Sequence, residues 1–222
     1  MTGIGLGIGA PFKKGEGSFL PRQIGILSHW YRKNLGQTEI DTGIDRWRDQ
    51  KGGADLRQTV DFDRPSLGAG GIVQFNGTSD FMDVAFTASP PWTIWVRCRV
   101  IAHGETYILD GINSDSGAIY MTGVSPNTEF FKGAQGFGSI NPVLNTWNNI
   151  LLEINGASSR ATLNNGTPVT GTLDGGSIGG LTIGGAGDDT RHSQTDFMEI
   201  ALFNGILSTQ AKADMQAYGA AL

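Results

Sequence analysis

Residues 92–100 alternate between apolar side chains and a second, mostly polar set, and this alternation constrains the fold more than any other feature of the sequence. A β-strand points successive side chains to opposite faces of its sheet, so a period of two predicts a strand with one buried face. The residues predicted to be buried are Trp92, Ile94, Val96, Cys98 and Val100. The opposite face of this strand carries Thr93, Trp95, Arg97 and Arg99. We expect Cys98 to be a buried, inert thiol.

Short strand-like runs separated by turn signals continue through the rest of the chain. Further strands are predicted at residues 44–49, 72–75, 107–109, 118–121, 129–131 and 148–154, with a long surface connection over 49–71. Asn-Gly pairs mark turns, because both central residues of a type I′ turn need a positive φ. These pairs are Asn155-Gly156, Asn165-Gly166 and Asn204-Gly205. Many short strands with frequent turns indicate a sandwich or a barrel.

The last fifteen residues change from the strand period to a helical one. Ser208 is a helix N-cap residue, since its side chain can accept a hydrogen bond from a backbone N–H of the first turn. The residues that then fall on one helical face are Ala211, Met215, Tyr218 and Leu222. We therefore expect a short C-terminal helix that packs this face on a sheet.

Residues 1–20 differ in composition from the rest of the chain. Ile4, Leu6 and Ile8 alternate with glycines, and Phe12 follows Pro11. Each glycine costs about 1 kcal/mol in a helix relative to alanine, so a stable helix is not expected here. We predict an extended arm over residues 1–20 that binds a partner subunit through these four apolar side chains, in the manner of an added strand. The alternative is a disordered start. Residues 21–222 are predicted to be one domain.

Several short blocks recur in a fixed order and together resemble a known family. Trp47, Asp49 and Gly52 form a W-x-D-x-x-G block, and Phe75-Asn76-Gly77 follows. Later blocks are a strand led by Trp147, a hairpin at 164–166, an acidic-apolar strand at 199–203 and Leu207-Ser208. This order is similar to that of laminin-G-like domains of the concanavalin A-like class. The resemblance implies an all-β fold, a two-sheet antiparallel jelly-roll sandwich.

The opening of the chain is similar to that of small bacteriophage virion proteins that carry this domain. The similarity lies in a glycine-rich start followed by residues 19–22 and a first tryptophan strand. It implies a virion location, with assembly in the host cytoplasm, and the major capsid protein or another virion protein as partner. We also expect a homo-oligomer, because closed symmetry is common among such proteins.

No carboxylate pair of the kind that glycosidases need is visible in the sequence. Glycosidases of this fold place two acidic residues at alternate positions of one strand, where one serves as acid and the other as nucleophile. Glu153 and Glu199 each stand alone among apolar neighbours, and we expect Glu199 to be a strand-end residue bonded to backbone. The protein is therefore predicted not to be an enzyme and to have no catalytic residue.

No cofactor is expected, and calcium has only weak support from the sequence. Candidate oxygen ligands are Asn76, Asp80, Asp83, Asp188, Asp189 and Asp196. Their spacing matches no dedicated calcium loop, so the alternative is that they are solvated or turn-capping side chains. The three histidines, His29, His103 and His192, lack metal-ligand spacing.

Charge and hydropathy exclude two classes of partner. Residues 1–64 hold ten Lys or Arg and eight Asp or Glu, whereas residues 65–222 hold six and thirteen. No basic face suited to phosphates is evident, so nucleic acid is not an expected partner. No apolar run approaches the roughly 20 residues of a membrane span, and residues 1–10 lack the basic segment of a secretory leader.

Two functions follow from these observations. The first is a capsid decoration or cement subunit, anchored through residues 1–20. The alternative is a carbohydrate-binding module on a phage tail or fibre, in which an exposed aromatic ring stacks on a sugar. Trp95 is the candidate for such stacking or for a subunit contact, because it points away from the predicted buried face.

Overall fold

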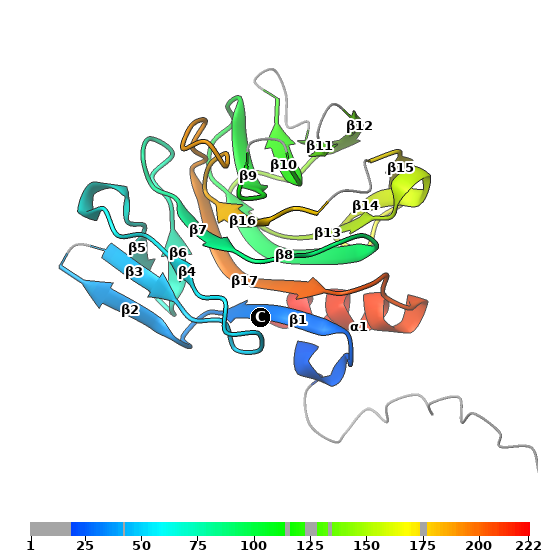
Figure 1. Ribbon diagram of the computed structural model, residues 1–222, viewed down its shortest axis with the longest axis horizontal. Coiled ribbons are helices and arrows are strands. Elements are labelled where there is room, and N and C mark those ends of the chain that lie inside the picture. Colours follow the sequence, from blue (N-terminus) through cyan, green and yellow to red (C-terminus); the bar gives the residue numbers. More distant parts are fainter. Residues whose placement is uncertain (1–18, 42, 114–115, 123–127, 133–134, 174–176) are drawn as a thin grey trace, which may run out of the picture.

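A computed structural model describes residues 19–41, 43–113, 116–122, 128–132, 135–173 and 177–222. Two antiparallel sheets pack face to face in a sandwich, and among the described residues one short α-helix of 12 residues lies against the outer face of one sheet (Figure 1). The predicted all-β sandwich with a C-terminal helix is therefore confirmed. The predicted partner-binding residues Ile4, Leu6, Ile8 and Phe12 lie outside the described residues.

Within the described residues, sheet A has eight strands and sheet B has nine. The strands of sheet A are β15 (Val169–Gly171), β14 (Ser159–Leu163), β13 (Trp147–Ile154), β8 (Trp92–Val100), β17 (Thr195–Phe203), β6 (Ile72–Gln74) and β5 (Ser66–Gly68) in spatial order, with β1 (Leu27–Arg32) also paired to β17. The strands of sheet B are β12 (Gln135–Ile140), β11 (Thr128–Lys132), β10 (Ala118–Met121), β9 (Thr106–Asp110), β16 (Gly180–Ile183), β7 (Met82–Ala85), β4 (Leu56–Arg57), β3 (Gly43–Trp47) and β2 (Gln37–Ile40). The same described residues contain three short 3-10 helices, η1 (Pro21–Gln23), η2 (Asp61–Asp63) and η3 (Gly156–Ser158).

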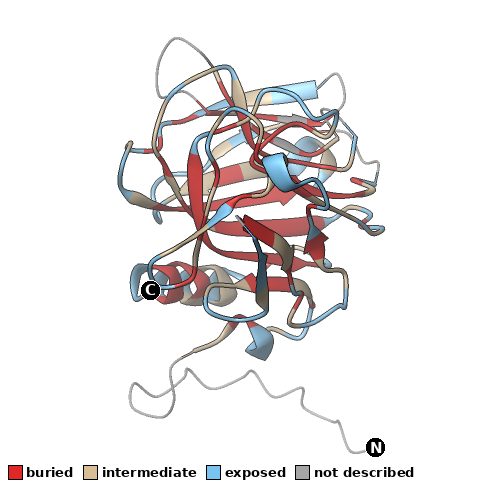
Figure 2. Cartoon of the chain, turned by 90° about the vertical axis from the view of Figure 1, so that its left-hand side faces the viewer, coloured by how far each residue is buried: buried red, intermediate tan, exposed pale blue. Residues whose placement is uncertain are grey.

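The main core lies between the two sheets, as the alternation in β8 predicts. The strand segments in the middle of the sandwich are coloured as buried in Figure 2, and their apolar residues form one core cluster. The inward residues of β8 meet apolar residues of sheet B such as Leu109, Ile119 and Ile183. Cys98 is fully buried there, and burial raises the pKa of its thiol to about 12, as expected of an inert cysteine.

A second apolar cluster lies on the outer face of sheet A, beneath α1 (Thr209–Ala220). The helix lies on the side of sheet A that faces away from β9, β10 and β11 (Figure 1). Ser208 accepts a hydrogen bond from the Ala211 backbone N–H at 3.2 Å, so the predicted N-cap is confirmed. Met215 and Tyr218 are buried against the sheet, which confirms the predicted helical face.

The hairpin between β14 and β15 turns one residue earlier than the sequence predicts. Asn164 and Asn165 have φ values of 47° and 62°, and the Gly166 N–H donates to the Leu163 carbonyl at 2.7 Å. The central residues are thus Asn164 and Asn165 rather than Asn165 and Gly166. Asparagine tolerates the left-handed region, and the Asn164 side chain gains a hydrogen bond to the backbone of Asn149 in this register.

The connection over residues 49–71 is more ordered than the predicted surface loop. It contains β4, η2 and β5, and its first residue, Asp49, is buried. In the part of the chain that the structure describes, every helix is too short or too polar to traverse a lipid bilayer.

Candidate functional site

The outer face of sheet A divides into a part covered by α1 and a polar part beside it. Trp95 is fully buried beneath the helix, and ring contact with Tyr218 at a centroid distance of 5.9 Å holds it there. Arg97 and Arg99 follow on the same face of β8 and remain partly exposed. Their register partners on β13 are Asn149 and Trp147.

Trp95 therefore does not have the role that the sequence suggested. Trp95 points away from the main core, as its alternation predicts, but α1 covers it completely. It offers no surface to a sugar ring or to a second subunit. The same alternation places Arg97 and Arg99 on the uncovered part of this face.

A cleft of about 470 Å³ lies where α1 passes the turn between β14 and β15. Its lining residues are Arg97, Asn149, Asn164, Asn165, Ala213, Gln216, Ala217 and Ala220. A smaller hollow of about 210 Å³ shares Asn165, Ala213 and Gln216 with it. We call the two together the α1 groove. One wall is an alanine-rich flank of the helix, and the other consists of amide and guanidinium side chains.

Hydrogen bonds fix the amide wall of the α1 groove. The Asn164 side chain accepts from the Asn149 backbone N–H at 2.8 Å and donates to Asn148 Oδ1 at 3.0 Å. Asn149 donates to the Gln216 carbonyl at 3.4 Å, which ties the strand to the helix. Gln216 is 7% exposed, and its Oε1 has no hydrogen-bond partner among the described residues. The wall is thus pre-organised on strands and helix.

Arg97 supplies the positive charge at the floor of the α1 groove. Its Nη1 donates to the Trp147 carbonyl at 3.1 Å and to Asn149 Oδ1 at 3.4 Å. Burial lowers the pKa of this guanidinium from its ordinary value. The other cation of the groove, Lys212, is already paired, because its Nζ lies 2.7 Å from Glu153 Oε1.

Trp147 lies two residues before Asn149 on β13, on the same face of sheet A, and is the register partner of Arg99. Its ring is partly exposed, and the Arg99 guanidinium carbon lies 5.0 Å from the ring centroid. Arg99 is in turn paired with Asp196 at 2.5 Å. Trp147 is therefore an aromatic surface held in position next to the groove.

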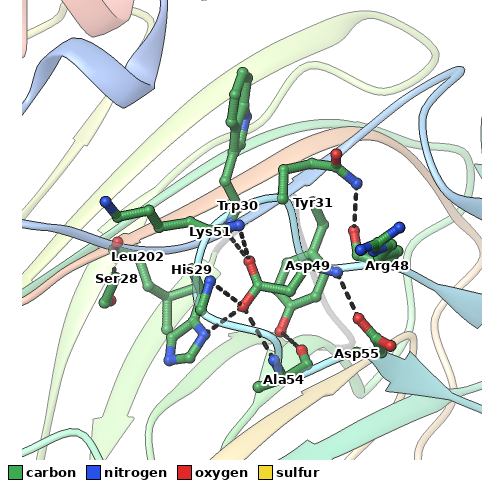
Figure 3. A network of polar contacts seen from close by, with 12 residues as sticks. Ser28, His29, Trp30, Tyr31, Arg48, Asp49, Lys51, Ala54, Asp55 and Leu202 are labelled. Atoms are coloured by element: carbon green, nitrogen blue, oxygen red, sulfur yellow. Dashed lines mark hydrogen bonds and ion pairs between the residues drawn. The ribbon is translucent and has the colours of Figure 1, made fainter.

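Asp49 is the centre of a separate polar network between β1 and the loop after β3. Figure 3 shows His29, the Ala54 backbone and neighbouring groups converging on its carboxylate. The acceptor oxygens take hydrogen bonds from the backbone N–H groups of Trp30, Lys51, Gly52 and Ala54, and Oδ2 lies 2.7 Å from His29 Nδ1.

These contacts make Asp49 a structural residue rather than a catalytic base. Burial acts to raise the pKa of Asp49, but the hydrogen bonds from His29 and the backbone outweigh it and hold the pKa below its ordinary value. A Cβ at Gly52 would lie 2.6 Å from the Ser28 carbonyl oxygen, so this loop needs glycine. The W-x-D-x-x-G block thus specifies a loop anchor.

The two isolated glutamates are both buried on the outer face of sheet A, each with side-chain partners. Glu153 pairs with Arg160 and Lys212. Glu199 lies within β17 and accepts hydrogen bonds from Trp30 Nε1 at 2.5 Å and from the Tyr218 hydroxyl at 2.7 Å. The expectation of a strand-end residue bonded to backbone is wrong for Glu199, because the buried tyrosine and tryptophan supply its donors.

The aspartates considered as calcium ligands are dispersed. Asp80 accepts from the Asn76 backbone N–H at 2.9 Å, and burial raises its pKa to about 6. Asp196 pairs with Arg99, whereas Asp188 and Asp189 lie on an exposed loop. Over the described ranges, no three His, Cys, Asp or Glu side chains gather around one point. These aspartates therefore support no metal site.

Comparisons of the chain with known proteins identify its fold. No known family matches its sequence, and no curated protein does so either. Among solved structures, a Trypanosoma rangeli sialidase in complex with sialic acid matches with a TM-score of 0.63 at 12% identity. The match covers 88% of this chain and 33% of the sialidase.

A second match is the binding domain of botulinum neurotoxin serotype D, with a TM-score of 0.65 at 11% identity. This match covers 86% of the chain and 51% of the toxin domain. The chain thus spans about a third to a half of the structures that it resembles. At these identities the likeness shows the jelly-roll-like sandwich alone.

Proposed function

We propose that the protein is a non-enzymatic carbohydrate-binding module whose ligand lies in the α1 groove. The observation that supports this most is the lining of the groove, where amide and guanidinium groups face a wall of alanines. Sugar hydroxyls both donate and accept hydrogen bonds, and planar amides and guanidinium groups can meet them in pairs. The volume of about 470 Å³ lies within the range of small-molecule sites, about 300–1,000 Å³.

The aromatic surface of Trp147 extends this site. Sugar rings present apolar C–H faces, which pack on aromatic rings, and Trp147 lies one row from Asn149 on the same face of sheet A. The groove would then hold the polar edge of a sugar, while the indole contacts the face of a neighbouring ring.

The non-enzymatic part of the proposal rests on the state of the glutamates. A glycosidase needs one carboxyl group as acid and a second as nucleophile or base, both open to substrate. Glu153 and Glu199 are fully buried and bonded to Arg160, Lys212, Trp30 and Tyr218. The two charged side chains that line the α1 groove, Arg97 and Lys212, are both basic.

A blocking substitution tests the location of the site. Ala217 is exposed on α1 and lines the groove, so Ala217→Trp fills the groove without disturbing the core. Gln210→Trp, at an exposed helix position outside the groove, is the matched control. On an array of glycans, we expect wild type and Gln210→Trp to bind the same structures and Ala217→Trp to lose them. Equal binding by all three proteins would place the ligand elsewhere, and no binding by wild type would refute the proposal.

We also propose, from a different observation, that the protein decorates a virion capsid through residues 1–20. The root of this segment is fixed, because Phe19 packs on α1 with a ring-centroid distance of 6.1 Å to Tyr218. Deletion of residues 1–18 should leave a folded sandwich that no longer associates with particles. Unchanged association of the shortened protein with particles would exclude this role.

A further inference from the structure

Arg97 differs from the other cations on the outer face of sheet A because it lacks a carboxylate partner. Arg99 pairs with Asp196, Arg160 and Lys212 pair with Glu153, and Arg32 lies 3.8 Å from Glu199. No carboxylate oxygen lies within 4 Å of the Arg97 guanidinium in the described ranges of the chain.

The absence of a partner is notable because an acidic residue stands beside Arg97. Glu199 is its register neighbour on β17. The Glu199 carboxylate is instead bonded to Trp30 Nε1 and the Tyr218 hydroxyl, beneath the end of α1. The Glu199 carboxylate is therefore occupied by contacts that attach the helix, and the charge of the Arg97 guanidinium has no carboxylate partner among the described residues.

The uncompensated charge is directed at the α1 groove. Nη1 of Arg97 is used by the Trp147 carbonyl and Asn149 Oδ1, whereas Nη2 has no hydrogen-bond partner among the described residues. The neighbouring lining residues Asn164, Asn165 and Gln216 are neutral. A partly buried cation among neutral groups is costly, and the arrival of an anion removes that cost.

We infer that the α1 groove takes an acidic saccharide and that Arg97 pairs with the sugar carboxylate. This inference rests on the proposed function and names its ligand class. A guanidinium offers parallel N–H donors that match the two oxygens of a carboxylate. One guanidinium among amides suits a single carboxylate, and the net charge of −5 of the chain disfavours a densely charged polyanion.

The test compares acidic glycans with their carboxyl-reduced forms. Oligosaccharides of a hexuronic acid and glycans ending in a nonulosonic acid are titrated calorimetrically, each beside the same glycan with its carboxyl group reduced to an alcohol. We expect wild type to prefer the acidic form of one of these two sources by about tenfold or more. Arg97→Gln should remove this preference while leaving the affinity for the reduced glycan within about twofold.

Two further measurements separate a ligand contact from a structural role. Arg97→Lys keeps the charge but not the parallel donors, so its preference for the acidic glycan should fall between those of wild type and Arg97→Gln. The thermal unfolding midpoint of Arg97→Gln should stay close to that of wild type, because removal of an uncompensated cation offsets the loss of the hydrogen bonds from Nη1 to the Trp147 carbonyl and Asn149 Oδ1.

The outcomes distinguish the inference from the proposed function. Equal binding of acidic and reduced glycans, lost in both cases in Ala217→Trp, would overturn the inference and keep the proposed function. A preference for the acidic glycan that survives Arg97→Gln would also overturn it. Failure of wild type to bind any glycan would overturn both.

Discussion

The hydroxyl of Tyr218 fastens α1 to sheet A, and its removal gives a sharp prediction. It lies 2.7 and 2.9 Å from the two carboxylate oxygens of Glu199, in a buried site. In Tyr218→Phe, Glu199 Oε1 keeps the Trp30 indole, but Oε2 keeps only Arg32 at 3.8 Å. Since hydrogen bonds to charged groups contribute about 1.5–3 kcal/mol, we expect the free energy of unfolding to fall by about that amount.

The substitution isolates the hydrogen bond because the phenyl ring keeps its packing against Trp95 and Phe19. For a chain of this length, 1 kcal/mol corresponds to about 2–4 °C in the unfolding midpoint, so a fall of about 3–12 °C is expected. Denaturant unfolding at pH 8, followed by tryptophan fluorescence, measures the free energy directly. Glu199→Gln and the double variant complete a double-mutant cycle.

The cycle decides whether the hydroxyl acts through Glu199. With a neutral glutamine at position 199, the loss on Tyr218→Phe should shrink to about 0.5–1.5 kcal/mol, the range of a neutral hydrogen bond. The two substitutions should therefore be coupled by about 1 kcal/mol or more. Additivity within about 0.5 kcal/mol would refute the reasoning, since Tyr218 would then stabilise the helix without the carboxylate.

Three further predictions concern other parts of the molecule. The pKa of Asp49 is lowered in the folded protein, so the carboxylate stabilises the fold above its unfolded pKa of about 3.9, and this stabilisation is lost as pH falls through the lower folded value. Asp49→Asn should therefore be less stable than wild type at pH 7, and its stability should depend less on pH in acid unfolding. The pKa of Asp80 is raised to about 6, so its effect on stability has the opposite pH dependence: the stabilisation is complete below about pH 3.9 and is lost as pH rises through 6. In denaturant unfolding, wild type should lose stability between about pH 4 and 7, and Asp80→Asn should remove this decline. Trp147→Ala should weaken glycan binding in calorimetry by about two- to tenfold while the unfolding midpoint falls only slightly, because the ring is partly exposed; an unchanged affinity would exclude the indole from the site.

Local patterns in the sequence were sufficient to predict the secondary structure around the site. The alternation of residues 92–100 predicted both faces of β8, and Ser208 with the spacing of Met215 and Tyr218 predicted α1. Both features depend on the geometry of a single strand or helix, so neighbouring residues carry the whole signal.

The site itself was not predictable in this way, because it depends on how α1 docks. Trp95 and Arg97 are two positions apart on one face of β8, and nothing in their local sequence distinguishes them. Trp95 is covered because it packs against Tyr218 of α1, a helix more than a hundred residues later, whereas Arg97 lines the cleft beside that helix. The turn at Asn164 is similar: its register follows from a hydrogen bond to Asn149 on the neighbouring strand.

Arg97 and Glu199 are register partners on β8 and β17, and this pair connects the docking of α1 with the proposed ligand site. A cation and a carboxylate at neighbouring positions of paired strands ordinarily pair with each other. Here Trp30 and Tyr218 hold the carboxylate of Glu199 under α1, and in doing so they withhold it from Arg97. The contacts that attach the helix, which forms one wall of the α1 groove, therefore also leave the groove with its unpaired positive charge. Attachment of the helix and recognition of an acidic sugar would thus depend on one carboxylate.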